Sequence, residues 1–413
     1  MTVKERSWKS FENLPAQAEN VAVEAGALCC GVGAKALAVS DGKQRRVAYF
    51  ADEKVWFALT EGLFLVRKGR NDSSFVAVNG VPLGDGGFAR LCLDGENEYL
   101  VFAGASGVYL LSLAGEAETV YAGRALPYAK EFHDRLFFAL PNAVVAYGEV
   151  GQVGGWVSSA DGAGKIELAN GGEIVGLAVL KERLYVFCKR SIARLDARGA
   201  GRDFTVEYLP YGGGDLVAYS VCECGNYVCF LSADGVYRFD GSSAEKVARL
   251  PDGWNGQSEV QSGADEGYYY LSYEADGTRK TFALNAEEKT VYYAFGVEAL
   301  TQGYDGCYCV ADGALSRLVK GGVAKGARRF FVAARDFGVK KEKTAVGVRV
   351  FGAGAVTVAL TGERGRQETR VSLAGGVGEG RLALKGKLFD VEIGLDDGAR
   401  VDGVTYLFEE VRV

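Results

Sequence analysis

The stretch NYVCFLSADGVYRFDGS, Asn226 to Ser242, joins two apolar strands through a tight polar turn, with Phe230 ending an apolar triplet of the first strand. The same phrase recurs around Phe57, Phe102, Phe138, Phe187, Tyr270 and Tyr308. The intervals between successive anchors are 45, 36, 49, 43, 40 and 38 residues. Strand-built units repeating every ~40–45 residues are typical of β-propeller blades. We therefore predict an all-β chain with a propeller of about seven blades.

The turns inside the repeats follow a glycine rule with two exceptions. A glycine stands five residues after four of the anchors, at Gly62, Gly107, Gly235 and Gly313. Glycine there permits the positive φ angles that tight hairpins need. Phe138 and Phe187 are instead followed at this spacing by Ala143 and Ile192, so these two units must turn differently and six blades remain possible. No segment has a sustained helical period.

The sequence pattern changes on both sides of the repeats. Residues 1–45 hold short strand-like pieces but no full phrase, and we expect them to supply a strand that closes the ring. The propeller is predicted at residues 46–322. Residues 325–413 contain six short alternating strands separated by Gly-rich or charged turns, from KTAVGVRVFG to VDGVTYLFEEVRV. That pattern predicts a small antiparallel β-sandwich.

Composition and charge limit the classes of function. The net charge of −6 gives the whole chain no cationic footprint for gripping nucleic-acid phosphates. The charge is uneven, +4 from Lys325 to Val413 and −10 over the rest, which is either ordinary surface variation or a basis for docking between subunits. The polar N-terminus has no secretion signal, and no apolar run is long enough to span a bilayer. The chain has nine cysteines, most of them within strand patterns, which suggests reduced, buried thiols of a chain folded in cytosol.

His133 is the only histidine of the chain, which excludes metal centres built on several imidazoles. With Asp134 beside it at the start of a strand, it has the composition of a general-base pair. A turn or capping role is favoured instead, because no nucleophile motif accompanies it. We assign no catalytic residue.

Two cysteine pairs, Cys222/Cys224 and Cys307/Cys309, are the closest approach to a metal site. Residues two apart on a strand share a face, so each pair would present its two sulfurs together. The spacing is not that of a zinc knuckle, and core packing is the default interpretation. We assign no metal ligand and expect no cofactor.

Other functional motifs fail on inspection. SADGVYRF at Ser232 has the Ser, Asp and Gly of a sialidase Asp box without its spacing or its tryptophan. WD dipeptides and kelch double glycines are missing from the blade phrases. Neither GGG at Gly212–Gly214 nor GVGAK at Gly31–Lys35 has the form of a phosphate-binding P-loop, so no cofactor-binding residue is assigned.

Three blade phrases resemble known proteins. They are GGEIVGLAVLKERLYVFCKRSIARL (Gly171–Leu195), AYSVCECGNYVCFLSADGVYRFDG (Ala218–Gly241) and FHDRLFFALPNAVVAYGEVGQVGGW (Phe132–Trp156). Together with LKGKLFDVEIG (Leu384–Gly394), followed by VDGVTYLFEE, they resemble β-propeller structural proteins of tailed bacteriophages, in the tail-hub, nozzle and packaged-DNA stabilisation class. The cysteine content is higher than that class leads us to expect.

The resemblance implies a non-enzymatic virion protein of the tail hub or head–tail junction, assembled in the host cytoplasm. Its expected partners are other tail or portal proteins and copies of itself in a ring. It implies proximity to packaged DNA without sequence-specific binding, where an acidic body would repel DNA and let it slide.

The alternative function is a carbohydrate-binding or carbohydrate-active propeller with a ligand site at the central mouth of the disc. Trp254, Tyr268, Tyr269 and Tyr304 could stack on sugars, although alternation between core and surface explains these aromatics as well. Converging carboxylates at the centre of the disc would favour the enzyme.

Overall fold

The computed structural model describes residues 3–410 except 12–13, 15, 41, 51–54, 61–62, 69–75, 83–85, 94–96, 112–116, 153–161, 170, 199–202, 304 and 321–326. Over this part the chain is almost entirely β, with a 3-10 turn, η2, at Ala374–Gly376. No helix among these residues has the length and apolarity needed to cross a membrane. The chain forms two compact units, one of residues 36–281 and 296–318, the other of residues 1–35, 282–295 and 319–413.

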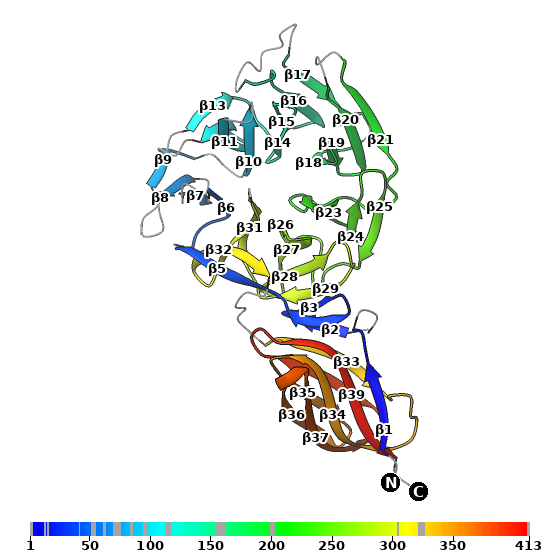
Figure 1. Ribbon diagram of the computed structural model, residues 1–413. Coiled ribbons are helices and arrows are strands. Elements are labelled where there is room, and N and C mark those ends of the chain that lie inside the picture. Colours follow the sequence, from blue (N-terminus) through cyan, green and yellow to red (C-terminus); the bar gives the residue numbers. More distant parts are fainter. Residues whose placement is uncertain are drawn as a thin grey trace. The chain divides into compact units, whose positions relative to one another are not determined.

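The first unit is built from antiparallel four-stranded sheets that follow one another along the chain (Figure 1). The first three sheets are β6 (Arg46–Phe50), β7 (Val55–Thr60), β8 (Leu63–Lys68) and β9 (Val76–Pro82); β10 (Gly86–Leu93), β11 (Asn97–Gly104), β12 (Gly107–Leu111) and β13 (Ala117–Tyr121); and β14 (Ala129–Phe132), β15 (Arg135–Leu140), β16 (Val144–Tyr147) and β17 (Gly164–Glu167). The next two are β18 (Ile174–Leu180), β19 (Arg183–Cys188), β20 (Ser191–Asp196) and β21 (Thr205–Leu209), and then β22 (Cys222–Cys224), β23 (Tyr227–Ser232), β24 (Gly235–Phe239) and β25 (Ala244–Ala248).

Two further sets of four strands complete the series. The sixth is β26 (Gln261–Asp265), β27 (Tyr268–Ala275), β28 (Thr278–Asn285) and β29 (Val291–Ala294). The seventh is β30 (Glu298–Gln302), β31 (Cys307–Ala311), β32 (Ala314–Lys320) and β5 (Val32–Val39), so its fourth strand comes from the N-terminal segment. The predicted β-propeller is confirmed, with seven blades in the described residues.

Each repeat anchor lies in the second strand of its blade. Phe57, Phe102, Phe138, Phe187 and Phe230 are completely buried, and Tyr270 and Tyr308 are nearly so. Strand alternation places each anchor on one face of its sheet, where it can pack against a neighbouring blade. Phe187 of the fourth blade, for instance, contacts Phe230 of the fifth at a ring-centroid distance of 5.6 Å. The aromatic anchors recur in the sequence because residues at this position pack between two neighbouring blades.

The hydrophobic core of the propeller lies between neighbouring blades rather than in one central mass. Separate clusters join the first blade to the second, the second to the third, the third to the fourth and the fourth to the fifth. A further cluster unites Ala299 and Tyr308 of the seventh blade with Val47 and Trp56 of the first. Because this cluster joins the last blade to the first, it closes the ring.

One of the two hairpins that lack the predicted glycine uses other left-handed residues. Asn142 and Ala143 adopt φ of 62° and 59° between β15 and β16, where an Asn-containing turn replaces glycine. In the sixth blade Asp276 and Gly277 adopt φ of 53° and 71°, as the Ala-Asp-Gly signal indicates. Gly62 lies outside the described residues.

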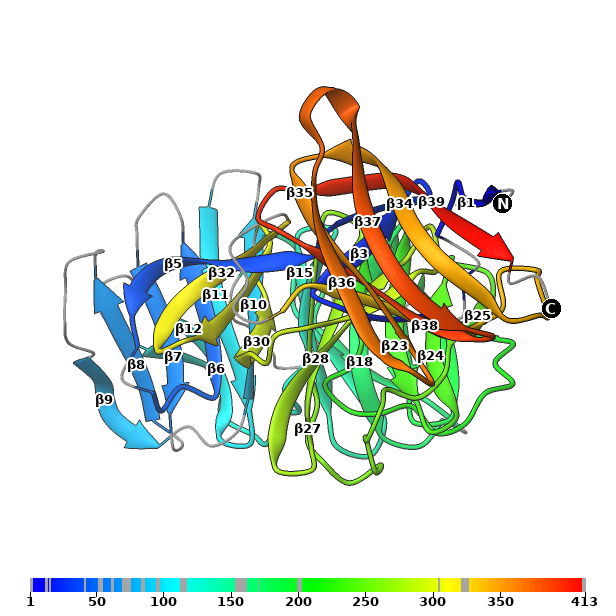
Figure 2. The same ribbon diagram turned by 90° about the horizontal axis from the view of Figure 1, so that it is seen from below.

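The second unit is a β-sandwich whose strands come from both ends of the chain. Its strands are β1 (Val3–Trp8), β2 (Ala16–Glu19), β3 (Val21–Glu24), β4 (Ala27–Cys30), β33 (Arg329–Arg335), β34 (Lys343–Ala353), β35 (Ala355–Gly362), β36 (Gly365–Ser372), β37 (Val377–Gly386), β38 (Phe389–Leu395) and β39 (Arg400–Glu410). One sheet has the order β3-β4-β39-β34-β37, with β1 also paired to β39. The other strands, in the order β2-β33-β38-β35-β36, belong to a nine-stranded sheet that continues from β2 to β29. Figure 2 shows β34 to β39 lying together.

An aromatic cluster fills the space between the two sheets of the sandwich. Phe389 of β38 lies 6.1 Å from Phe408 of β39, and Phe337 lies 4.9 Å from Tyr406 and 5.9 Å from Trp8 between ring centroids. All six strands predicted within residues 325–413 are present. The segment was expected to form the sandwich alone, whereas β1, β2 and β4 of the N-terminal segment pair with β39 and β33. Residues 1–35 therefore belong to the sandwich unit, because their contacts in space are mainly with it.

Candidate functional site

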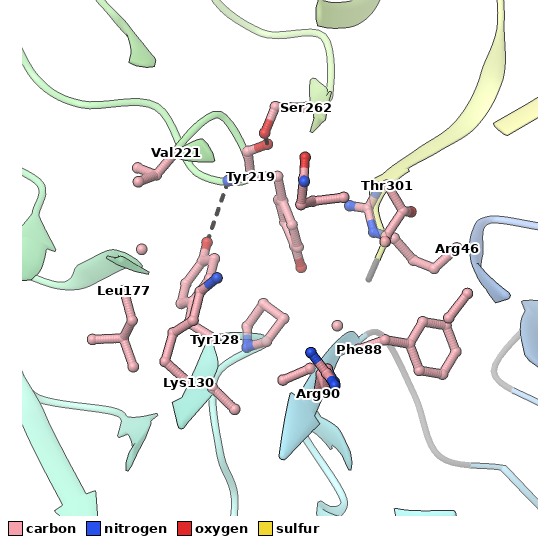
Figure 3. A pocket seen from close by; sticks show the side chains of 18 of the residues that line it. Arg46, Phe88, Arg90, Tyr128, Lys130, Leu177, Tyr219, Val221, Ser262 and Thr301 are labelled. Carbon is pink, nitrogen blue, oxygen red and sulfur yellow. Dashed lines mark hydrogen bonds between the residues drawn. The ribbon is translucent and has the colours of Figure 1, made fainter. Parts of the chain in front are cut away.

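A cavity of about 340 Å³ lies where the first strands of the blades meet, entirely within the propeller unit. Every blade contributes to its lining: Arg46 from β6, Arg90 from β10, Lys130 from β14, Leu177 from β18, Glu223 from β22, Ser262 from β26 and Thr301 from β30. Tyr128 and Tyr219, which directly precede β14 and β22, complete its walls. Figure 3 shows Arg46, Arg90, Lys130, Tyr128 and Tyr219 approaching one another from separate blades. The cavity is thus the central mouth of the propeller.

Arg46 is a buried cation held on the wall of this cavity. Its guanidinium carbon lies 4.4 Å from the centroid of the Tyr219 ring, which is cation–π distance. Its Nη2 donates to Glu259 Oε1 at 3.0 Å, and the Glu259 side chain is largely exposed. A planar guanidinium that stacks on a ring and bonds at one edge is fixed in orientation.

Lys130 is paired with the one carboxylate among the described lining residues. Its ammonium lies 3.0 Å from Glu223 Oε1, and the same oxygen accepts the backbone N–H of Val179 at 2.6 Å. Burial acts to lower the pKa of Lys130, but the charge and hydrogen bond of Glu223 outweigh it, so the pKa is raised. Lys130 is therefore protonated at neutral pH.

Two tyrosines form the aromatic part of the wall. The rings of Tyr128 and Tyr219 are 5.9 Å apart between centroids and inclined at 52°. Burial, followed by the neighbouring Tyr219, raises the pKa of Tyr128 above its ordinary value, so the phenol stays neutral. Tyr219 has φ of +61°, a conformation rarely adopted by bulky residues. Ser262 Oγ donates to the carbonyl of Tyr219 at 2.8 Å. The backbone N–H of Tyr219 donates to Tyr128 Oη at 3.4 Å.

The cavity wall has an excess of positive charge. Three of its charged side chains are cations, Arg46, Arg90 and Lys130, and one of its described lining residues is an acid, Glu223. The acidic body expected to repel DNA therefore does not extend to the central cavity. The arrangement favours an anion over a cation.

His133 and Asp134 form the turn between β14 and β15 and do not line the cavity. Their φ angles are 50° and 54°, and the backbone N–H of Asp134 donates to Glu131 Oε1 at 3.1 Å. His133 is exposed and lies with its ring centroid 4.0 Å from that of Phe132. This is the turn role that the sequence favoured.

The cysteine pairs lie in strands of the fifth and seventh blades. Cys222 and Cys224 belong to β22, Cys307 and Cys309 belong to β31, and all four are buried free thiols. Burial raises the pKa of Cys222, Cys307 and Cys309. Within the described ranges, no group of three or more Cys, His, Asp or Glu side chains is placed to hold a metal ion. The thiols pack in the core.

The aromatics suggested for sugar stacking do not converge on the cavity. Tyr268 and Tyr269 are buried, and the hydroxyl of Tyr269 donates to the carbonyl of Ser220 at 2.7 Å. Trp254 lies in the segment before β26, where its Nε1 donates to Ser258 O at 3.3 Å, and it does not line the cavity. Tyr304 lies outside the described residues. Sugar stacking by this set is therefore not supported.

Several cavity residues stand at a similar distance in sequence from the aromatic anchor of their blade. Arg46, Arg90, Tyr128 and Tyr219 stand 10 to 12 residues before the anchor of their blade, and Lys130 stands 8 before it. The strand that leads into each anchor strand supplies lining residues in every blade, although residues at this offset in the sixth and seventh blades, 258–260 and 296–298, do not line the cavity. Reading these offsets across all repeats would have placed the two arginines together.

No family model matches the chain, and no curated protein matches it. Among solved structures, it is similar to virginiamycin B lyase from Staphylococcus aureus, with 12% identity, 70% of this chain and 98% of that chain covered, and a TM-score of 0.49. It is also similar to the Pan2 WD40 domain of Neurospora crassa, with 13% identity, coverage of 67% and 88%, and a TM-score of 0.45. At such identities the likeness concerns the fold alone.

Proposed function

We propose that the protein is a structural component of a tailed-bacteriophage virion, part of the tail hub or head–tail junction. The observation that carries the proposal is the position of the phage-like phrases in the fold. They occupy β15–β16, β18–β20 and β22–β24 in three successive blades, and β38 and β39 in the sandwich. The Trp156 that ends one phrase lies outside the described residues.

The chemistry of the central mouth supports a protein without catalytic activity. Glycoside hydrolysis generally needs two carboxylates flanking the bond that is cleaved. Of the described residues that line the cavity, Glu223 alone is acidic, and its carboxylate is engaged by Lys130 and by the amide of Val179. The carbohydrate-active alternative therefore has one of the two groups it needs. A carbohydrate-binding mouth remains compatible with the cavity.

Assembly is the property on which the two functions differ. A hub protein would form a closed ring of identical subunits, with tail or portal proteins as further partners. It would stand near packaged DNA without reading its sequence, since the chain lacks a cationic footprint. Blades that pack tightly against one another form a rigid scaffold, and the loops that connect their strands would then contact the partner proteins.

The test is electron microscopy and sedimentation of the purified full chain over a concentration series. Closed rings, or a concentration-dependent oligomer of defined size, are expected. A strict monomer at the highest attainable concentration would contradict the assembly role. A parallel assay for hydrolysis of a panel of oligosaccharides addresses the non-enzymatic assignment, and turnover abolished by Glu223→Gln would overturn it.

A further inference from the structure

We propose that the central cavity of the propeller binds a small anionic ligand, a carboxylate or phosphate carried on a ring of about monosaccharide size. The inference concerns the propeller alone and does not depend on the virion assignment. It rests on three properties of the cavity: its charge, its aromatic wall and its size.

Charge is the first property. Three cationic side chains approach the cavity from three different blades, and Arg46 and Lys130 are each bonded to one carboxylate oxygen. A guanidinium has five N–H donors and an ammonium has three, so one such bond leaves each group able to donate again. Planar guanidinium groups suit two-pronged recognition of carboxylate or phosphate. An anion between Arg46, Arg90 and Lys130 would accept hydrogen bonds from three cationic side chains at once.

The aromatic wall is the second property. Tyr128 and Tyr219 both line the cavity with their ring centroids 5.9 Å apart, and Arg46 stacks on one face of the Tyr219 ring. Aromatic faces with hydroxyl tips bind the apolar face and the polar rim of one ring together. Ser262 Oγ fixes the carbonyl of Tyr219 and so holds this residue in its strained conformation. Strained residues cluster at ligand sites because the surroundings must hold them there.

Size is the third property. The volume of about 340 Å³ lies at the lower end of the ~300–1,000 Å³ that small-molecule sites occupy. It accommodates a single sugar ring with its charged group and is too small for a nucleic-acid duplex or a folded domain. The seven inner strands supply the wall, so the site forms only when the ring is closed.

The experiment is titration calorimetry of the full-length protein with three probes of similar size. N-acetylneuraminic acid presents a carboxylate, glucose 6-phosphate presents a phosphate, and glucose is the neutral control. We expect heat from at least one anion and none from glucose, and the stronger anion identifies the source of the charge. Binding should weaken in salt of about 1 M, where the screening length falls to about 3 Å.

Arg90→Gln is the decisive variant, because Arg90 is exposed and its loss should leave the fold intact. Loss of one charge-assisted contact should weaken anion binding by about tenfold. Arg249→Gln, an exposed arginine that does not line the cavity, is the matched control and should bind as the wild type does. Equal binding of glucose, no heat from either anion, or anion binding unchanged in Arg90→Gln would each overturn the proposal. The oligomeric state is measured separately, so either proposal can fail alone.

Discussion

Asp234 is a test of how one turn carboxylate stabilises a blade. It lies between β23 and β24, where Oδ1 accepts the N–H of Gly214 at 3.0 Å and the hydroxyl of Ser232 at 2.9 Å. Oδ2 accepts the hydroxyl of Tyr237 at 2.7 Å and the ammonium of Lys246 at 3.3 Å. Burial acts to raise the pKa of this carboxyl, but these four donors hold it well below its ordinary value. The Ser and Asp that resemble an Asp box therefore serve the hairpin.

Asp234→Asn removes the charge while keeping the shape. One end of the amide is a donor, so the ammonium of Lys246 loses its bond to Oδ2 and the Tyr237 hydroxyl can no longer donate there. Hydrogen bonds to charged groups contribute about 1.5–3 kcal/mol each when well buried. The Asp234 side chain is 43% exposed, and solvent screening reduces this value. We expect the free energy of unfolding of the propeller to fall by about 1–2 kcal/mol at neutral pH.

The effect of this variant must depend on pH with a definite sign. Because the folded pKa lies below the unfolded value of 3.8, the carboxylate contributes stability above pH ~4. That contribution is lost as pH falls through the folded pKa, when the native carboxylate takes up a proton. The difference between wild type and Asp234→Asn should therefore be complete at pH 7 and narrow progressively below about pH 4.

The measurement is urea denaturation followed by fluorescence, with hydrogen exchange of the β23–β24 amides as a local readout. The local readout is needed because two compact units need not unfold together. Asp276→Asn is the matched control, since Asp276 is exposed in the β27–β28 turn at φ of 53°, which asparagine tolerates. Equal destabilisation by both variants, or a difference that persists unchanged at low pH, would refute the reasoning.

Three further predictions address packing and thiols. Phe187→Ala should lower the free energy of unfolding by about 3–5 kcal/mol, measured as a shift of the urea midpoint, because Phe187 is completely buried between blades. Gly176→Ala should cost about 1–3 kcal/mol in the same assay, because a β-carbon there would lie 2.5 Å from that of Val221. A thiol reagent should modify the half-buried Cys29 and Cys92 first and all nine cysteines only after denaturation, and equal native reactivity of the nine would contradict the burial.

The parts of the fold that could be predicted are those determined by residues close together in the sequence. Phe187 and Phe230 lie within apolar strands next to turn signals, so periodicity identified both strands and the repeat that relates them. The arrangement at the centre of the propeller depends instead on residues far apart in the sequence. Arg46 and Tyr219 are 173 residues apart in the chain, and they meet because ring closure brings the first and fifth blades to one cavity. No pattern within a single repeat encodes that meeting.

The N-terminal segment shows the same limit for the sandwich. The strand β1 is VKERSW, whose composition is that of an exposed segment, and only Trp8 is partly buried. Its pairing with β39 spans about the whole chain, with Val3 opposite Glu409. Long-range pairing is selected by the partner's free edge and by contacts such as Trp8 on Tyr406, at a centroid distance of 5.2 Å. These determinants are invisible in the local sequence.

Two bulky residues in left-handed conformations show how the fold and the cavity differ. Phe337 has φ of 52°, and its ring is buried against Phe408 and Tyr406, so core packing offsets its backbone strain. Tyr219 has φ of 61°, yet its ring is only half-buried and faces the cavity. Its strain is offset by contacts with Arg46 and Ser262, which orient the ring rather than fill a core. Backbone strain that brings no gain in core packing is the feature expected if the cavity is the ligand site that we propose.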